Sequence, residues 1–149
     1  MNSLFNEKES SAIISRINRL TPDSRSNWGK MNVSQMLAHC QEPLQIALGK
    51  KNLKRNLFGI LFGRIAKKKL VSDQPYKHSL PTAPSFIVKD ERSFEIEKTK
   101  LLQLVEEFTK GGEAGLTKEP HGFFGPLTNE EWDKSQWKHL DHHLQQFGV

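Results

Sequence analysis

Apolar residues recur at helical spacing along most of this 149-residue chain, and almost nowhere do they alternate as in a half-buried strand. Residues 8–20, 32–48, 92–110 and 128–147 each place a stripe of apolar side chains on one helix face. Only Val71 and residues 86–88 leave room for a short strand. Four amphipathic helices with long connections predict an all-α fold, a helical bundle.

Local signals mark where these helices begin and end. Residues 32–35 (Asn-Val-Ser-Gln) and 128–131 (Thr-Asn-Glu-Glu) have the pattern of capping boxes, in which the first and last side chains satisfy each other's backbone N–H groups. Pro43 removes one backbone donor and predicts a kink or an early break in the second helix. Prolines and polar residues in 70–89, and glycines and prolines in 113–127, predict two long crossing loops.

The size and the cysteine content exclude several protein classes. A chain of 149 residues predicts one domain, 1–149, which can bury a core without disulfides. A single cysteine excludes an internal disulfide. The longest apolar run, 58–62, is too short to cross a bilayer, and residues 1–9 lack the layout of a signal peptide. We therefore expect a soluble, cytoplasmic domain.

The formal net charge of +5 comes from one segment, 50–69. This segment has no acidic residue, and its cations are Lys50, Lys51, Lys54, Arg55, Arg64, Lys67, Lys68 and Lys69. Outside it, 14 basic residues stand against 17 acidic ones, so the remainder carries a net charge of −3. The positive charge is therefore a local feature and not a property of the whole chain.

Apolar residues recur every four positions within this basic segment, which predicts a third, broken helix that Gly59 and Gly63 weaken. We interpret it as a helix that packs on the core while its lysines face solvent. On this interpretation neither nucleic acid nor a membrane is expected as a partner. The alternative is a non-catalytic binding module that uses residues 50–69 on anionic lipid or nucleic acid.

Three of the six histidines fall within five residues of the last helix: His139, His142 and His143. Residues four apart share a helix face, so His139 and His143 point the same way, toward the core, while His142 is turned aside toward solvent. The H-x-x-x-H spacing is typical of divalent-metal ligands. The alternative is a chance pair, partly exposed near a helix C-terminus, where the helix dipole favours charged imidazoles.

His39, on the buried side of the second helix, could complete a three-histidine site from a facing helix. Taken alone, His39 is better interpreted as a core or boundary histidine bonded to a backbone carbonyl. His121, in the glycine-rich loop, and His142 are further candidate ligands. Cys40 follows His39 at about 100° around the helix, so a buried structural cysteine is expected there.

Two segments resemble motifs of a known superfamily. Residues 28–39, Trp-Gly-Lys-Met-Asn-Val-Ser-Gln-Met-Leu-Ala-His, resemble the start of the first metal-bearing helix of DinB/YfiT-like metalloenzymes. Residues 138–147, with H-x-x-x-H before Gln146, resemble the last-helix motif of that superfamily. Residues 120–128 are similar to one branch, known as a domain of unknown function.

The resemblance implies a four-helix bundle with an up-down-down-up course. It also implies a divalent ion of nickel, zinc or iron bound by His39, His139 and His143. Relatives include thiol S-transferases that use low-molecular-weight thiols, a thiol-dependent isomerase, and hydrolases without a known substrate. The expected function is therefore a metal-dependent transferase or hydrolase that acts on a small molecule, with a low-molecular-weight thiol as one candidate substrate. Gln35, Gln136 and Gln146 are candidates to orient the ligands. A homodimer, and a bundle that has lost its activity, remain open alternatives.

Overall fold

The computed structural model describes residues 2–54, 57–78 and 84–149, and these form five α-helices and no strand. The all-α prediction is therefore confirmed. The helices and two short 3₁₀ turns are α1 (Glu7–Arg19), α2 (Val33–Ala47), α3 (Leu57–Leu70), η1 (Pro84–Phe86), α4 (Phe94–Gly111), η2 (Gly112–Gly115) and α5 (Asn129–Gln146).

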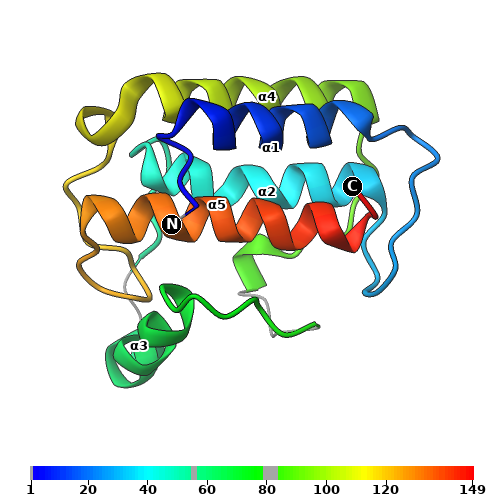
Figure 1. Cartoon of the computed structure of the whole chain (residues 1–149). Coiled ribbons are helices and arrows are strands. Elements are labelled where there is room, and N and C mark those ends of the chain that lie inside the picture. The colour runs from blue at the N-terminus through cyan, green and yellow to red at the C-terminus, as the bar shows by residue number, and fades with distance from the viewer. Residues whose placement is uncertain (1, 55–56, 79–83) are drawn as a thin grey trace.

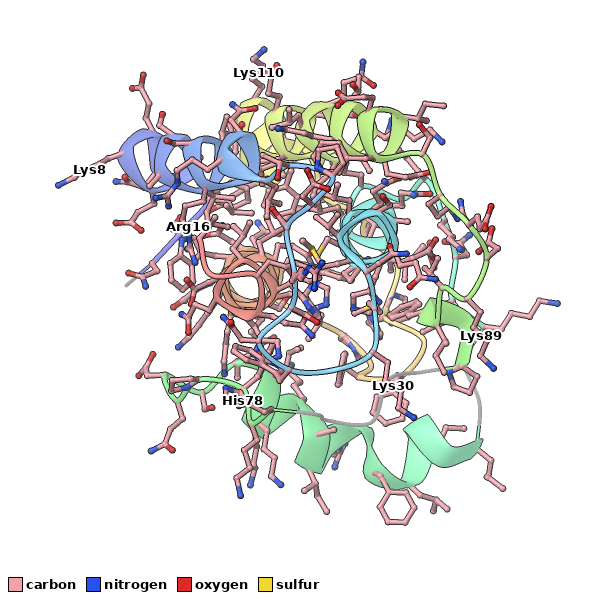
Figure 2. The ribbon with its side chains drawn as sticks, turned by 90° about the vertical axis from the view of Figure 1, so that its right-hand side faces the viewer. Lys8, Arg16, Lys30, His78, Lys89 and Lys110 are labelled. Carbon is pink, nitrogen blue, oxygen red and sulfur yellow. The ribbon has the colours of Figure 1, made fainter. Side chains whose placement is uncertain are left out.

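Four of the helices surround one core. α2 packs against α4 and α5, and α1 packs against the same two helices. In Figure 1 the colours show that α1 and α5 run from left to right while α2 and α4 run the opposite way. α1 and α4 lie together in one layer, and α2 and α5 lie together in the other, in Figure 1 and in the end-on view of Figure 2.

Both predicted capping boxes are present. Asn32 Oδ1 accepts from the Gln35 N–H at 2.8 Å, and Thr128 Oγ1 accepts from the Glu131 N–H at 3.1 Å. The predicted break at Pro43 is wrong, because α2 continues to Ala47. A proline inside a helix removes one hydrogen bond, and the buried residues that flank it, from Met36 to Leu44, hold the helix in place.

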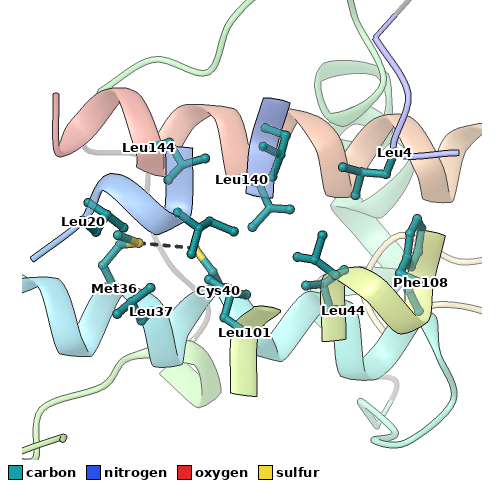
Figure 3. Close-up of a cluster of buried hydrophobic side chains, with 14 of the residues drawn as sticks. Leu4, Leu20, Met36, Leu37, Cys40, Leu44, Leu101, Phe108, Leu140 and Leu144 are labelled. Atoms are coloured by element: carbon teal, nitrogen blue, oxygen red, sulfur yellow. Dashed lines mark hydrogen bonds between the residues drawn. The ribbon is translucent and has the colours of Figure 1, made fainter. Parts of the chain in front are cut away.

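The core consists of aliphatic and aromatic side chains from the four packed helices and the N-terminal segment (Figure 3). Cys40 is buried among them as predicted, with its Sγ 3.6 Å from the sulfur of Met36. Burial raises the pKa of the Cys40 thiol far above its ordinary value, so the group stays a neutral thiol. At one end Phe108 stacks on Phe5 with ring centroids 5.2 Å apart.

Replacing Phe108 by alanine is expected to lower the free energy of unfolding by about 3–5 kcal/mol, because Phe108 is only 1% exposed and the cavity cannot refill. Urea denaturation measures the difference. Ile96→Ala, on the exposed side of the same helix, is the matched control and should change stability by less than about 0.5 kcal/mol. Equal losses in the two variants would show that Phe108 does not anchor the core.

α3 differs from its prediction in two ways. It is one continuous helix through Gly59 and Gly63, and most of its described apolar side chains are exposed and not packed on the core. Leu57, Leu61 and Ile65 are exposed, whereas Gly59 and Gly63 are buried. The two glycines lie against the backbone of Phe123, an approach too close for any larger residue, and this turns the apolar stripe outward.

The long connections follow their prediction in part. Residues 84–86 of the 70–89 crossing form a 3₁₀ turn, not a strand, and residues 79–83 lie outside the described residues, as does Arg55 of the basic segment. In the second crossing, His121 and Gly125 pair through two backbone hydrogen bonds of 2.9 Å. In the described part of the chain no helix combines the length and apolar character needed to span a bilayer.

Candidate metal centre

His39 from α2 and His139 and His143 from α5 come together in the structure; we call them the histidine triad. One ring nitrogen from each lies within 4.8 Å of the others. The ring centroids are 4.7–5.0 Å apart. The spacing of four residues puts both α5 imidazoles on one face, and the packing of α2 against α5 brings the third imidazole to them.

A backbone carbonyl fixes the tautomer of His39. Its Nδ1 lies 2.9 Å from the carbonyl oxygen of Phe86. Because a carbonyl can only accept, Nδ1 carries the proton and donates it there, which leaves the Nε2 lone pair free to face the triad. This is the arrangement in which a neutral histidine binds a metal ion.

A side-chain amide fixes His143 in the same way. The Gln146 Nε2 group donates to the Trp28 carbonyl oxygen at 2.6 Å, so the Gln146 Oε1 must face His143. His143 Nδ1 donates to that oxygen at 2.8 Å, and its Nε2 lone pair is left for the triad. Gln146 therefore orients the His143 ring, and its role behind a metal ligand stays a prediction.

His139 completes the triad and is the only one of the three that is partly exposed. Its Nε2 lies 3.1 Å from the His39 Nε2. Since the His39 nitrogen has a lone pair, the His139 Nε2–H donates to it when no metal is bound. Binding a metal ion through this nitrogen requires His139 to hold its proton on Nδ1 instead.

Burial keeps all three imidazoles neutral. It lowers the pKa of His39, although the bond to the Phe86 carbonyl acts in the opposite direction. It lowers the pKa of His139 well below its ordinary value, and that of His143 to about 3, with nearby histidines adding to both effects. Three neutral imidazoles, two of them with Nε2 lone pairs fixed toward the triad, fit a borderline divalent ion such as zinc, nickel or iron once His139 holds its proton on Nδ1.

The other candidate residues lie elsewhere. His121 is buried, and its Nδ1 accepts from the Phe123 and Phe124 N–H groups at 3.0 and 3.2 Å, so it stabilises the glycine-rich loop and is not part of the triad. Gln35 is used in its capping box and donates to the Asp90 carbonyl. Gln136 donates to Ser135.

His142 is half-buried and not turned to open solvent as expected. It packs against aromatic rings from two loops: Trp28 at 5.8 Å and His78 at 6.3 Å between centroids, with His78 itself stacked on Trp28 at 3.8 Å. His78 lies below α5 in Figure 2. A cavity of about 60 Å³ next to these rings is lined by Tyr76, Lys138 and His142.

The sequence model of the family described as "Protein of unknown function (DUF1569)" matches residues 4–148. The chain belongs to this family. No curated protein and no solved structure matches the chain. The region shared with the DUF1569 family contains the whole histidine triad together with Phe86 and Gln146.

Some partners of the triad in this DUF1569 chain could not be found from sequence. The carbonyls of Phe86 and Trp28 are backbone groups, which every residue type possesses, so no residue pattern marks them. His78 shows no helical spacing to another histidine, and only the folding of its loop brings it to Trp28. The glutamine three residues after His143 was the one partner with a local signal.

Proposed function

We propose that this protein is a divalent-metal-dependent enzyme in which His39, His139 and His143 bind the ion. The observation that carries the proposal is the pair of fixed tautomers: the Phe86 carbonyl and the Gln146 amide hold two Nδ1–H groups outward, so that the Nε2 lone pairs converge. A buried imidazole needs both ring nitrogens satisfied, and a shared ion would satisfy the inward-facing nitrogen of each triad histidine.

We further propose that the fold is a DinB/YfiT-like bundle. The directions of α1, α2, α4 and α5 in Figure 1 correspond to an up-down-down-up course. The triad comes from α2 and α5, the two helices that the resemblance of residues 28–39 and 138–147 points to. DUF1569 would then be one branch of that superfamily.

The chemistry proposed is transfer to or from a low-molecular-weight thiol, or hydrolysis, on a small-molecule substrate. A divalent ion held by three imidazoles supplies a Lewis acid with open coordination positions, which lowers the pKa of a thiol or of water. The chain's part is to hold the ligands neutral and oriented, through Phe86 and Gln146, and to leave access at the partly exposed His139.

An activity assay of zinc-, nickel- and iron(II)-loaded protein tests this function. Reaction of small thiols with electrophilic acceptors, and hydrolysis of amides and esters, are followed for loaded protein, for metal-free protein and for His143→Ala. We expect turnover of one substrate class with loaded wild type, falling to the metal-free rate in the variant. Turnover that is equal in metal-free and loaded protein would contradict the proposal.

Gln146→Leu is expected to weaken metal binding about 10- to 100-fold, because His143 loses the acceptor that fixes its tautomer. Competition with a chromogenic chelator measures the affinity. Gln145→Leu changes the neighbouring, exposed glutamine and is the matched control, with affinity unchanged. If both variants bind as tightly as wild type, Gln146 does not orient a ligand.

A further inference from the structure

The outward side of α3 is an apolar surface with no covering element among the described residues. Leu57 is 72% exposed, and Leu61 and Ile65 are each 63% exposed. Figure 2 shows α3 at the edge of the molecule with side chains projecting away from the other helices. We call this surface the α3 face and define it by Leu57, Ile60, Leu61 and Ile65.

The orientation of α3 is fixed by contacts on its opposite side. A Cβ atom at Gly63 would lie 2.1 Å from the Phe123 carbonyl oxygen, so only glycine allows the helix to sit this close to the loop. Lys67 donates to the Pro126 carbonyl at 2.8 Å and pairs with Glu131 at 2.7 Å. These contacts fix the orientation of α3 and keep its apolar side chains pointing to solvent. Their exposure therefore follows from how α3 packs on the 120–126 loop.

Positive charge lies on and beside the α3 face, because Arg64 and Lys68 stand four and eight residues after Ile60 in the same helix. No acidic residue occurs from position 43 to position 72. Four cations of this stretch are exposed and form no ion pair with any residue of the described ranges: Lys54, Arg64, Lys68 and Lys69. We call them the basic rim. By contrast, Lys50 and Lys51 pair with Glu107 and Glu42 on the body of the protein.

An apolar helix face bordered by unpaired cations matches the surface of an anionic bilayer, where apolar side chains enter the headgroup–acyl boundary and cations meet phosphates. A second copy of the chain fits less well, because two α3 faces in contact would bring two basic rims together with no carboxylate between them. Nucleic acid also fits less well, since its phosphate backbone offers the exposed leucine and isoleucine side chains no apolar surface.

We propose that α3 is a membrane-surface helix that binds anionic phospholipid bilayers through the α3 face and the basic rim. The helix lies in the plane of the bilayer surface and does not cross it. The inference stands on the exposure and charge of α3 and does not depend on the metal centre, which lies between α2 and α5.

Vesicle co-sedimentation of the full chain tests this inference. The vesicles are phosphatidylcholine alone, or phosphatidylcholine with about 30% phosphatidylglycerol. We expect binding to the anionic vesicles only, weakened by salt on the order of 0.5 M. Ile65→Asp is expected to reduce binding at least about tenfold by removing apolar contact and adding a negative charge. Arg64→Glu combined with Lys68→Glu is expected to do the same.

Ile96→Asp is the matched control, since Ile96 is 54% exposed on α4 and the same substitution there should leave vesicle binding unchanged. Thermal unfolding of each variant shows that the fold persists. Equal binding to neutral vesicles, or no binding to either kind, would overturn the proposal. Two other results would also overturn it. The first is self-association of the wild-type protein without vesicles, measured by analytical ultracentrifugation and abolished by Ile65→Asp. The second is binding of the protein to duplex DNA that Ile65→Asp leaves intact.

Discussion

Replacing His139 and His143 together by alanine is expected to abolish divalent-metal binding, with the affinity for zinc or nickel near neutral pH lowered by at least about 1,000-fold. Both imidazoles are neutral and come from one face of α5, and the His39 imidazole alone cannot hold the ion. Titration calorimetry on untagged, metal-free protein gives the affinity and a stoichiometry of about one ion per chain for wild type.

His142→Ala is the matched control, because His142 is adjacent on the same helix and lies outside the triad. It should bind metal like wild type. Ion binding should also raise the unfolding free energy of wild type, by about 2.7 kcal/mol at a free concentration one hundred times the dissociation constant, and should leave the double variant unchanged. Undiminished affinity in the double variant, or no stabilisation of wild type, would contradict the assignment.

The metal-free protein is expected to lose stability steeply between pH 6.5 and pH 4, and His121 alone accounts for about 3 kcal/mol of that loss. Burial lowers the pKa of His121 from 6.5 to about 4. Above pH 6.5 the side chain is neutral in both the folded and unfolded chain. Between the two values the unfolded chain takes up a proton that the folded chain does not, so the free energy of unfolding falls as the pH falls.

Urea denaturation at pH 7.0 and at about pH 4 measures this loss. His121→Asn is the informative variant, because the asparagine Oδ1 can replace Nδ1 as acceptor for the Phe123 and Phe124 N–H groups without titrating. We expect the variant to lose less stability than wild type over the same interval. An identical pH dependence in the two proteins would show that His121 is not held neutral in the fold. The triad histidines act in the same direction and are common to both proteins.

Features encoded by local spacing could be predicted from the sequence. The two capping boxes and the shared face of His139 and His143 depend only on residues within one helix. That His39 lies next to this pair could be predicted only from the general expectation that a facing helix of a bundle supplies a third ligand. The distance of 3.1 Å between His39 Nε2 and His139 Nε2 results from the packing of α2 on α5.

Features that depend on packing between distant segments were missed. The apolar stripe of α3 is typical of a core-facing helix, but the close approach of Gly59 and Gly63 to Phe123 directs it to solvent. Gln35 was expected near the ligands. Instead its side-chain amide accepts from the Asn32 N–H in the capping box and donates to the Asp90 carbonyl. In both cases a local pattern allows two arrangements, and only tertiary contacts select one.

X-ray absorption spectroscopy of the zinc-loaded protein tests the central claim most directly, because it counts the ligands of the ion and identifies their atoms. We predict three imidazole nitrogens at about 2.0–2.1 Å, with remaining scattering from oxygen. We expect no sulfur, since Cys40 is a buried neutral thiol in the core. A sulfur ligand at about 2.3 Å, or fewer than three imidazoles, would contradict a centre built from His39, His139 and His143.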